Sequence, residues 1–394
     1  MDWTYNLKKL KKDFKEDKRF TLFVGAGLNA GKNVKLLWND LIKQACGYSF
    51  RRIGNNLSMN SSDVKYLLQL LGVEKIDVNQ IVNNQNTNVE EALSDLLRHK
   101  DYTTTHFPVE VQVSIIKTLL GDSYIPFLQD YLYSQCNKRK IHKAFNQYAI
   151  NENHEAPNGN ELHTLYVVAR MILLNPQIEK VISYNYDNFL SEAALYLFRN
   201  VQRFFTDTEI KFMISRYGLE SVADFETFVP VIDYGNDWEI TESRTNRRVT
   251  RIYHVHGYIP SPDEMQYLEA PRIILSMDEY CSSLNGDSNG FIAIQEQAIK
   301  SSNCLFVGLS VTDLSTKRLL NSAHENGKKY AVYILDAYDK SLQSTDSYYK
   351  ISSILRRIKN SYLETLGASF IDCDKGFEFL FNEIATIKDN SIKE

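Results

Sequence analysis

Apolar residues along this chain follow two spacings that alternate. Short, continuous apolar runs rich in strand-forming residues occur at residues 20–24, 181–184 and 304–307. After each run, apolar residues recur three or four positions apart, the spacing of a helix with one buried face. Continuous runs of this length are typical of strands that are buried on both faces. The pattern predicts an α/β fold, a Rossmann-like parallel sheet with helices on both faces.

The same two spacings predict the remaining elements. Further strands are expected at 225–233, 249–256, 272–276 and 330–335, and helices at 5–18, 36–47, 162–174, 290–299, 314–325 and 377–387. Between residues 48 and 160 helical spacing dominates, and the connecting stretches are polar and rich in asparagine. We therefore expect residues 1–47 and 161–394 to form the Rossmann-like domain, with 48–160 as a mostly helical insertion.

Composition restricts the class of protein. Of the 394 residues, 43% are hydrophobic and 24% are charged, which is enough for a sizeable core. The net charge of −4 argues against a surface that coats nucleic acid, and the lysine-rich stretch 8–18 is interpreted as the solvated face of a helix. Five cysteines are scattered singly, so no metal site or disulfide framework is expected. Without a signal peptide or a membrane-spanning run, we expect a cytoplasmic protein with no membrane partner.

The first buried run ends in a glycine-rich turn. Gly25 and Gly27 would let the main chain approach a diphosphate, and a helix start beyond them would offer free N–H groups. The turn matches only part of the GxGxxG fingerprint, because Ala30 stands where the third glycine would be. A tight turn without a ligand explains this motif alone equally well.

Polar side chains follow two other expected strands. Asn185 and Asp187 come directly after the run 181–184, where they could hold ribose hydroxyls and orient a water molecule. Capping of the next helix is the competing interpretation, and it fits Asn188 better. His256 ends another expected strand and could act as a general base near neutral pH. His254 lies deeper in that strand and is expected to be structural.

A second glycine turn follows the run 304–307. Gly308 would permit close approach of a ligand, and the Ser310 hydroxyl could contact ribose or phosphate. Asp313 is interpreted as the N-cap of the helix that starts at 314. If all four strands are parallel, the four groups of polar and glycine residues meet at one edge of the sheet, which predicts a nucleotide site there.

These motifs together resemble the sirtuin-like (silent information regulator) family. The matching segments are Gly25-Ala26-Gly27 with Asn29, residues 38–42, Tyr184 to Asp187, His256-Gly257, and Val307 to Asp313. The resemblance spans residues 20–335 apart from 48–160, and it implies a Rossmann-like NAD-binding domain. By motif position it implies that Asn185 and His256 are catalytic and that the NAD contacts are Gly25, Ala26, Gly27, Asn29, Asp187, Gly308 and Ser310.

Departures from the family pattern indicate a branch. Deacetylase sirtuins carry a four-cysteine zinc module that is absent here, and the segment that builds their acyl-peptide channel has no match. The chain is more similar to bacterial antiphage sirtuin-like proteins that hydrolyse NAD, one of which pairs with a HerA-type hexameric ATPase. The resemblance implies a metal-independent NADase that depletes NAD+ in antiviral defence, forms a homo-oligomer and has a HerA-type partner.

Two other functions stay open at this point. An NAD-dependent protein deacylase would use the same cleft on an acylated peptide. A non-catalytic sensor would bind NAD or ADP-ribose through Asn185 and His256 without cleaving it. A nuclease is disfavoured because the chain lacks the clustered acidic residues that two-metal cleavage needs.

Overall fold

The computed structural model describes residues 3–16, 18–29, 41, 109–148, 162–234, 249–263, 273–274, 279, 289–309, 314–322, 328–333 and 346–372. The chain divides into two compact units, one of residues 1–35, 136–272 and 289–394, the other of residues 36–135 and 273–288. The expected insertion at 48–160 stays a prediction, because only residues 109–148 of that segment are described.

The larger unit is built on one sheet. Its seven strands in the described residues follow the order β3-β4-β2-β1-β5-β6-β7. They are β1 (Phe20–Val24), β2 (Ile178–Ser183), β3 (Val231–Tyr234), β4 (Thr250–His254), β5 (Asn303–Val307), β6 (Lys329–Tyr333) and β7 (Ser369–Asp372). Every neighbouring pair is parallel, which confirms the expected sheet.

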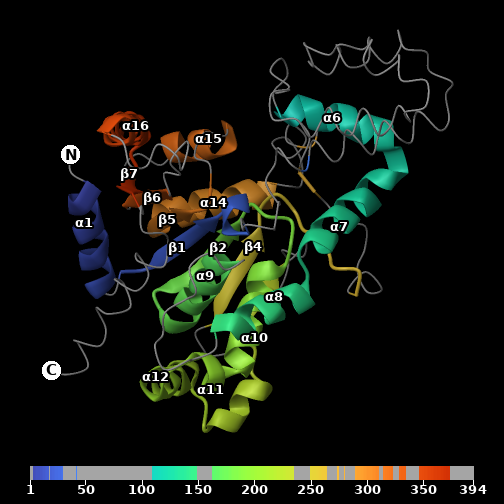
Figure 1. Ribbon diagram of the computed structural model, residues 1–394, viewed down its shortest axis with the longest axis vertical. Coiled ribbons are helices and arrows are strands. Elements are labelled where there is room, and N and C mark those ends of the chain that lie inside the picture. Colours follow the sequence, from blue (N-terminus) through green and yellow to red (C-terminus); the bar gives the residue numbers. More distant parts are fainter. Residues whose placement is uncertain are drawn as a thin grey trace. The chain divides into compact units, whose positions relative to one another are not determined.

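Helices cover both faces of this sheet. They are α1 (Trp3–Lys15), α8 (Lys138–Phe145), α9 (His163–Leu174), α10 (Phe189–Arg199), α11 (Val201–Phe204), α12 (Asp207–Tyr217), α14 (Asn289–Ser301), α15 (Leu314–Ser322) and α16 (Asp346–Thr365). In Figure 1, α9 and α10 lie on one side of the strands and α14 and α15 on the other. This follows from right-handed crossovers, because the path from β1 to β2 and the path from β4 to β5 run in opposite directions across the sheet. The expected Rossmann-like arrangement is confirmed.

The central strands are apolar along their whole length. All five residues of β1 and all five of β5 are buried, because neighbouring strands and helices surround them. The rings of Phe23 and Phe306 stack with centroids 4.7 Å apart across these two strands. Burial on both faces is why these segments show no alternation of polar and apolar residues.

The smaller unit is helical where it is described. It contains α6 (Val109–Leu120) and α7 (Tyr124–Gln135), joined by the 3-10 helix η2 (Gly121–Ser123). Val113, Ile116 and Leu128 are buried in it. The Lys117 ammonium donates to the Glu279 carboxylate at 2.6 Å. Across the described residues of both units, no helix has the length and apolar character that a membrane span requires.

One expected strand was wrong over most of its length. Residues 225–233 were expected to be extended, but Val222–Glu226 form the 3-10 helix η4 and β3 begins only at Val231. Asp224 accepts the backbone N–H groups of Glu220 and Ser221, which starts the helical turn. The Phe225 side chain is buried against Phe198 of α10, and this contact made the segment look like part of a strand.

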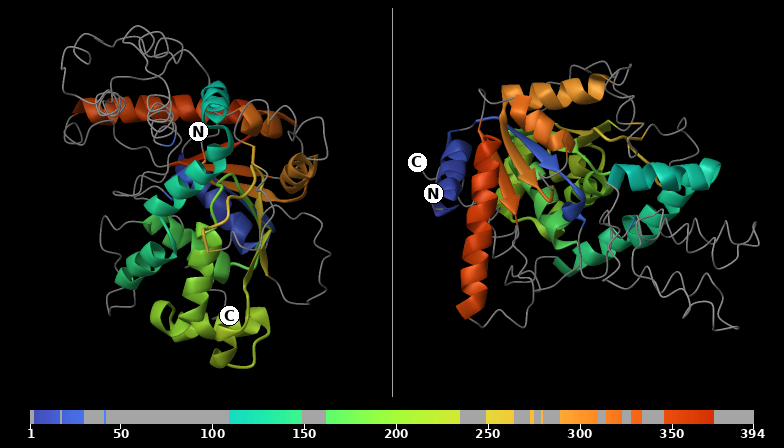
Figure 2. Two further views of the ribbon diagram at one scale, coloured as in Figure 1. Left: turned by 90° about the vertical axis from the view of Figure 1, so that its right-hand side faces the viewer. Right: turned by 90° about the horizontal axis from the view of Figure 1, so that it is seen from above.

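Other boundaries differ at particular residues. The strand expected to reach His256 ends at His254, and residues 255–256 form a turn. The first helix ends at Lys15 instead of Lys18. Neither α16 nor β7 was expected, and in Figure 2 α1 and α16 flank β7, which both helices contact. The helices expected at 36–47 and 377–387 lie outside the described residues, apart from residue 41.

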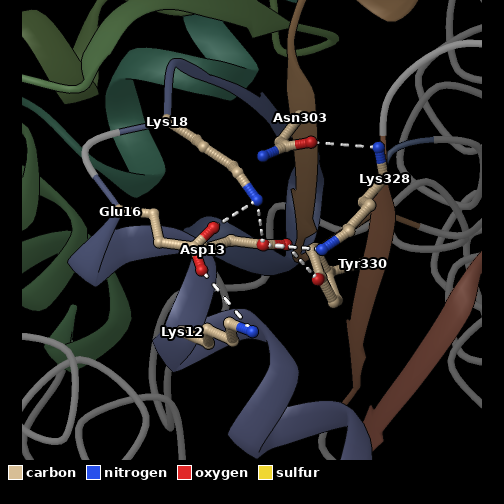
Figure 3. A network of polar contacts seen from close by, with 7 residues as sticks. All are labelled: Lys12, Asp13, Glu16, Lys18, Asn303, Lys328 and Tyr330. Atoms are coloured by element: carbon tan, nitrogen blue, oxygen red, sulfur yellow. Dashed lines mark hydrogen bonds and ion pairs between the residues drawn. The ribbon is translucent and has the colours of Figure 1, made fainter.

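A buried carboxylate fixes α1 to the amino end of β6. Asp13 is fully buried and accepts hydrogen bonds from Lys18 at 2.9 Å, Lys328 at 2.6 Å and Tyr330 at 2.5 Å (Figure 3). Burial raises the pKa of Asp13, but the hydrogen bonds from Lys328, Tyr330 and Lys18 outweigh burial, so its pKa is lowered. Lys18 therefore does not belong to the solvated lysine face that the sequence predicts.

We expect Asp13→Ala to lower the free energy of unfolding by about 2–4 kcal/mol, because Lys328 and Tyr330 lose a buried acceptor. Denaturant unfolding of the purified protein measures this change. Lys12→Ala is the matched control on the same helix, because its ion pair with Glu16, 3.6 Å long, is exposed. The control should change the free energy of unfolding by less than about 0.5 kcal/mol. Equal losses of stability in the two variants would contradict the proposed role of Asp13 in holding α1 to the sheet.

Candidate functional site

Four adjacent strands end at one level of the sheet. In the order β4-β2-β1-β5, the residues His254, Ser183, Val24 and Val307 are in register. The segments that follow them carry the residues singled out in the sequence, so the expected convergence at one edge is observed. Because the crossovers from β1 to β2 and from β4 to β5 run in opposite directions across the sheet, this edge is also where an open α/β sheet forms its ligand crevice.

The two glycine turns pack directly against each other. The N–H of Gly27 donates to the carbonyl of Gly308 at 2.8 Å. A Cβ on Gly27 would lie 2.8 Å from the Gly308 Cα, and one on Gly308 would lie 2.5 Å from the Leu28 nitrogen. A Cβ on Gly25 would lie 2.8 Å from the Gly308 carbonyl oxygen. These glycines are therefore required by the contact between two main chains, whatever ligand lies beyond them.

Few of the N–H groups expected to face a phosphate are free. Residues Ala26–Leu28 form the short 3-10 helix η1, and the N–H groups of Leu28 and Asn29 donate to Gly25 and Ala26 carbonyls. The Gly25 N–H donates to the carbonyl of Val307, the last residue of β5, and the Gly27 N–H donates to the Gly308 carbonyl. Within the described part of the chain, Ala26 is the residue of this turn whose N–H has no partner. The expected row of open N–H groups is reduced to one.

Asn29 links the glycine turn to the segment after β2. Its side chain is 1% exposed, and its Nδ2 donates to the Asp187 carboxylate at 2.9 Å. Because an ionised carboxylate only accepts, this contact assigns the amide orientation and leaves the Asn29 Oδ1 as a buried acceptor. Oδ1 has no hydrogen-bond partner among the described residues. A buried acceptor of this kind is suited to a hydroxyl or amide donor of a ligand.

Asp187 is held on both of its oxygens. The second oxygen accepts a hydrogen bond of 3.1 Å from the N–H of Phe189, the first residue of α10. The helix-capping role assigned to Asn188 therefore falls to Asp187, since the Asn188 side chain makes no capping hydrogen bond. Burial raises the pKa of Asp187 to about 6, against the opposing effects of the Phe189 N–H and of His254.

His254 is more closely connected to the site than the sequence indicates. Its Nδ1 lies 2.8 Å from the main-chain carbonyl of Asn185, a residue that is itself 7% exposed. Its Nε2 lies 2.9 Å from the Asp233 carboxylate at the end of β3. Sequence reasoning missed Asp233, because a lone acidic residue in an expected strand carries no distinguishing signal.

His256 is placed on a turn and not on a strand. It is half-buried, and its ring meets the Tyr184 ring edge-on with centroids 4.9 Å apart. The Tyr184 hydroxyl donates to Gln295 of α14 at 2.6 Å, which fixes this tyrosine. Gly257 follows with a φ of 92°, a conformation that favours glycine.

Residues 179–361 match the family model of the SIR2-like domain. Over this range the chain is similar to SIR2-like domains. The matched range contains Asn185, Asp187, His256 and Gly308, and it supports the resemblance to the sirtuin-like family. SIR2-like domains use NAD+, so NAD+ is the ligand against which this edge has to be judged. No curated protein matches the sequence.

The available groups at this edge of the sheet fit a nucleotide in part. Ala26 N–H suits a phosphate oxygen, and the Asn29 Oδ1 suits a hydroxyl or amide. Ser310 and Asp313 lie outside the described residues. Within the described residues, no group of three or more His, Cys, Asp or Glu side chains could hold a metal ion. The assignments of NAD contacts and catalytic residues stay predictions.

Alanine substitutions at two glycines with similar φ angles but different surroundings test why the turns need glycine. Gly308 has a φ of 63° and Gly218, at the end of α12, has a φ of 65°. A Cβ at Gly218 would meet no atom within 4 Å, so Gly218→Ala pays only the strain of its backbone, about 1–2 kcal/mol. We expect Gly308→Ala to lose at least about 2 kcal/mol more in denaturant unfolding. Equal losses would show that the turns tolerate a side chain at 308.

The raised pKa of Asp187 predicts a pH-dependent stability. Its ordinary pKa is 3.8 and its folded pKa is about 6, so the folded protein binds the proton more tightly than the unfolded chain. Stability from this group is present below its ordinary pKa and is lost as pH rises through about 6. Between about pH 4 and pH 7 the wild type should lose up to about 3 kcal/mol relative to Asp187→Asn. Urea unfolding of both proteins measures this, and parallel pH profiles would contradict it.

Proposed function

We propose that this protein hydrolyses NAD+ to nicotinamide and ADP-ribose at the edge where β4, β2, β1 and β5 end. The observation that carries the proposal is the convergence of Asn185, the Asn29–Asp187 pair and His256 at that edge, in a chain whose residues 179–361 match the SIR2-like domain. A ligand that spans the turn after β1 and His256, two residues beyond the end of β4, crosses the end of β2 and has to be extended, as a dinucleotide is.

The proposed reaction needs little acid catalysis from the protein. The nicotinamide of NAD+ is already cationic, so it leaves as a neutral molecule when the glycosidic C–N bond breaks. Asn185 would orient the ribose and the attacking water, and His256 would accept a proton as the new C–O bond forms. Tyr184 and its partner Gln295 would hold the His256 ring in place.

The wider biological role rests on the resemblance alone. We propose that depletion of NAD+ serves antiviral defence and that a homo-oligomer acts with a HerA-type ATPase. The absence of a four-cysteine module from the sequence favours hydrolysis over protein deacylation, because deacetylase sirtuins rely on that module.

We expect Asn185→Ala and His256→Ala each to lower nicotinamide release by about 10²–10⁴-fold, because a positioned base contributes a factor of this size. Chromatography of NAD+, nicotinamide and ADP-ribose after incubation measures the loss. His142→Ala is the control, because His142 is a half-buried histidine that stacks on Tyr196 in the α8–α10 contact. The control should keep wild-type turnover.

Each competing function gives a different result in this assay. Product that forms only with an acetylated peptide would indicate a deacylase. Binding of NAD+ or ADP-ribose without nicotinamide release, with the neighbouring gene product present, would indicate a sensor. Near-normal turnover in folded His256→Ala would refute the assignment of the base.

A further inference from the structure

The imidazole of His254 is buried between two partners. It ends β4, is 2% exposed, and contacts the Asn185 carbonyl through Nδ1 and the Asp233 carboxylate through Nε2. A carbonyl can only accept a hydrogen bond, so Nδ1 carries a hydrogen. The tautomer and the ring orientation are thus determined by the surroundings of His254.

Charge in this pocket favours the protonated ring. Burial by itself lowers the pKa of His254, but the Asp233 carboxylate, the Asn185 carbonyl and the Asp187 charge raise it, and the pKa is raised overall. With both nitrogens protonated, the ring donates through Nδ1 to the Asn185 carbonyl and forms an ion pair through Nε2 with Asp233. A hydrogen bond from a charged donor is about twice as strong as one from a neutral donor.

Asp233 is itself held by α10. Its second oxygen lies 2.6 Å from the Ser191 hydroxyl, which is also 2.8 Å from the Asn188 carbonyl. These contacts connect Asp233 of β3 to His254, and His254 to the Asn185 carbonyl. Asp233 also contacts Ser191 of α10, so the contacts lie around the segment between β2 and α10 that carries Asn185 and Asp187.

The contact with Asn185 falls where regular structure is absent. Asn185 follows the last residue of β2 by two positions, and its own N–H makes only a 3.2 Å hydrogen bond to the Ser183 hydroxyl. Its carbonyl is therefore held by a side chain and not by a ladder of strand hydrogen bonds. Loss of this contact would release the ψ angle of Asn185, so the backbone that carries its side chain would be less firmly held.

We infer that His254 is a positioning residue, with Asp233 as its counter-ion, that sets the orientation of Asn185 by holding its main-chain carbonyl. This inference rests on the proposed function for the role of Asn185 in turnover. The contact itself is a property of the folded chain and can be tested without turnover.

Two substitutions of His254 separate its two contacts. An asparagine amide nitrogen lies near the position of Nδ1, so His254→Asn keeps a donor for the Asn185 carbonyl. A glutamine amide nitrogen lies near the position of Nε2, so His254→Gln keeps a donor for Asp233 and loses the one for Asn185. We expect His254→Gln to lower kcat by about 10–100-fold with little change in KM, and His254→Asn to retain most of kcat.

The side-chain amide signal of Asn185 gives a result that does not depend on turnover. It can be assigned in a 15N spectrum from its loss in Asn185→Asp. The signal should move in His254→Gln and keep its position in His254→Asn. If it stays in place in both variants, or if both lose kcat equally, the positioning role is overturned. If the wild type releases no nicotinamide, the proposed function fails, and the amide signal still decides this inference.

A further measurement uses the wild-type protein, so it does not depend on whether a His254 variant folds. A 15N spectrum of its ring should show a hydrogen on Nδ1 throughout about pH 6 to 8, because that nitrogen donates to the Asn185 carbonyl. An Nδ1 without hydrogen in that range overturns the inference.

Discussion

The turn after β1 and the turn after β5 touch through their main chains, and the rest of the site depends on this contact. Gly27 donates to the Gly308 carbonyl, and neither residue has room for a Cβ. The contact sets the height of the β1 turn above the sheet, and this height brings Asn29 within hydrogen-bond distance of Asp187. A side chain at either glycine would separate the turns, so the polar contacts beyond them would have to change as well.

Polar groups at this edge are satisfied mainly by one another. Asn29 binds Asp187, Asp187 caps α10, and His254 joins the Asn185 carbonyl to Asp233. Such a network is rigid, because a buried polar group that loses its partner has no water to replace it. The acceptor at Asn29 Oδ1 is then a notable exception, since a buried atom without a partner is costly unless a ligand uses it. Rigid surroundings with one open acceptor are what a binding site requires.

The strands at this edge could be predicted because burial on both faces leaves a direct trace in the sequence, as at 20–24 and 304–307. Their parallel order then places the polar residues of four loops together without further information. The contacts among those loops could not be predicted, because they depend on tertiary neighbours. Asp187 and Asn188 are equally good caps by residue type, and only the folded position of the Phe189 N–H, which donates to Asp187, distinguishes them. His254 is expected to be structural from its depth in the strand, and its partner Asp233 lies on a different strand.

The same dependence on distant partners links the site to complete folding of the larger unit. Asn29 and Asp187 are 158 positions apart, and the Thr21 and Ser302 hydroxyls, 2.7 Å apart between β1 and the start of β5, are separated by 281 positions. Pairings over such distances form late, because the entropy of closing a long loop is lost before the contact contributes. β1 therefore acquires its second neighbour only after most of the chain is present. The glycine turn needs that second neighbour, because Gly27 donates to the Gly308 carbonyl, so a chain that has not yet paired β5 with β1 holds the residues of the site without the complete site.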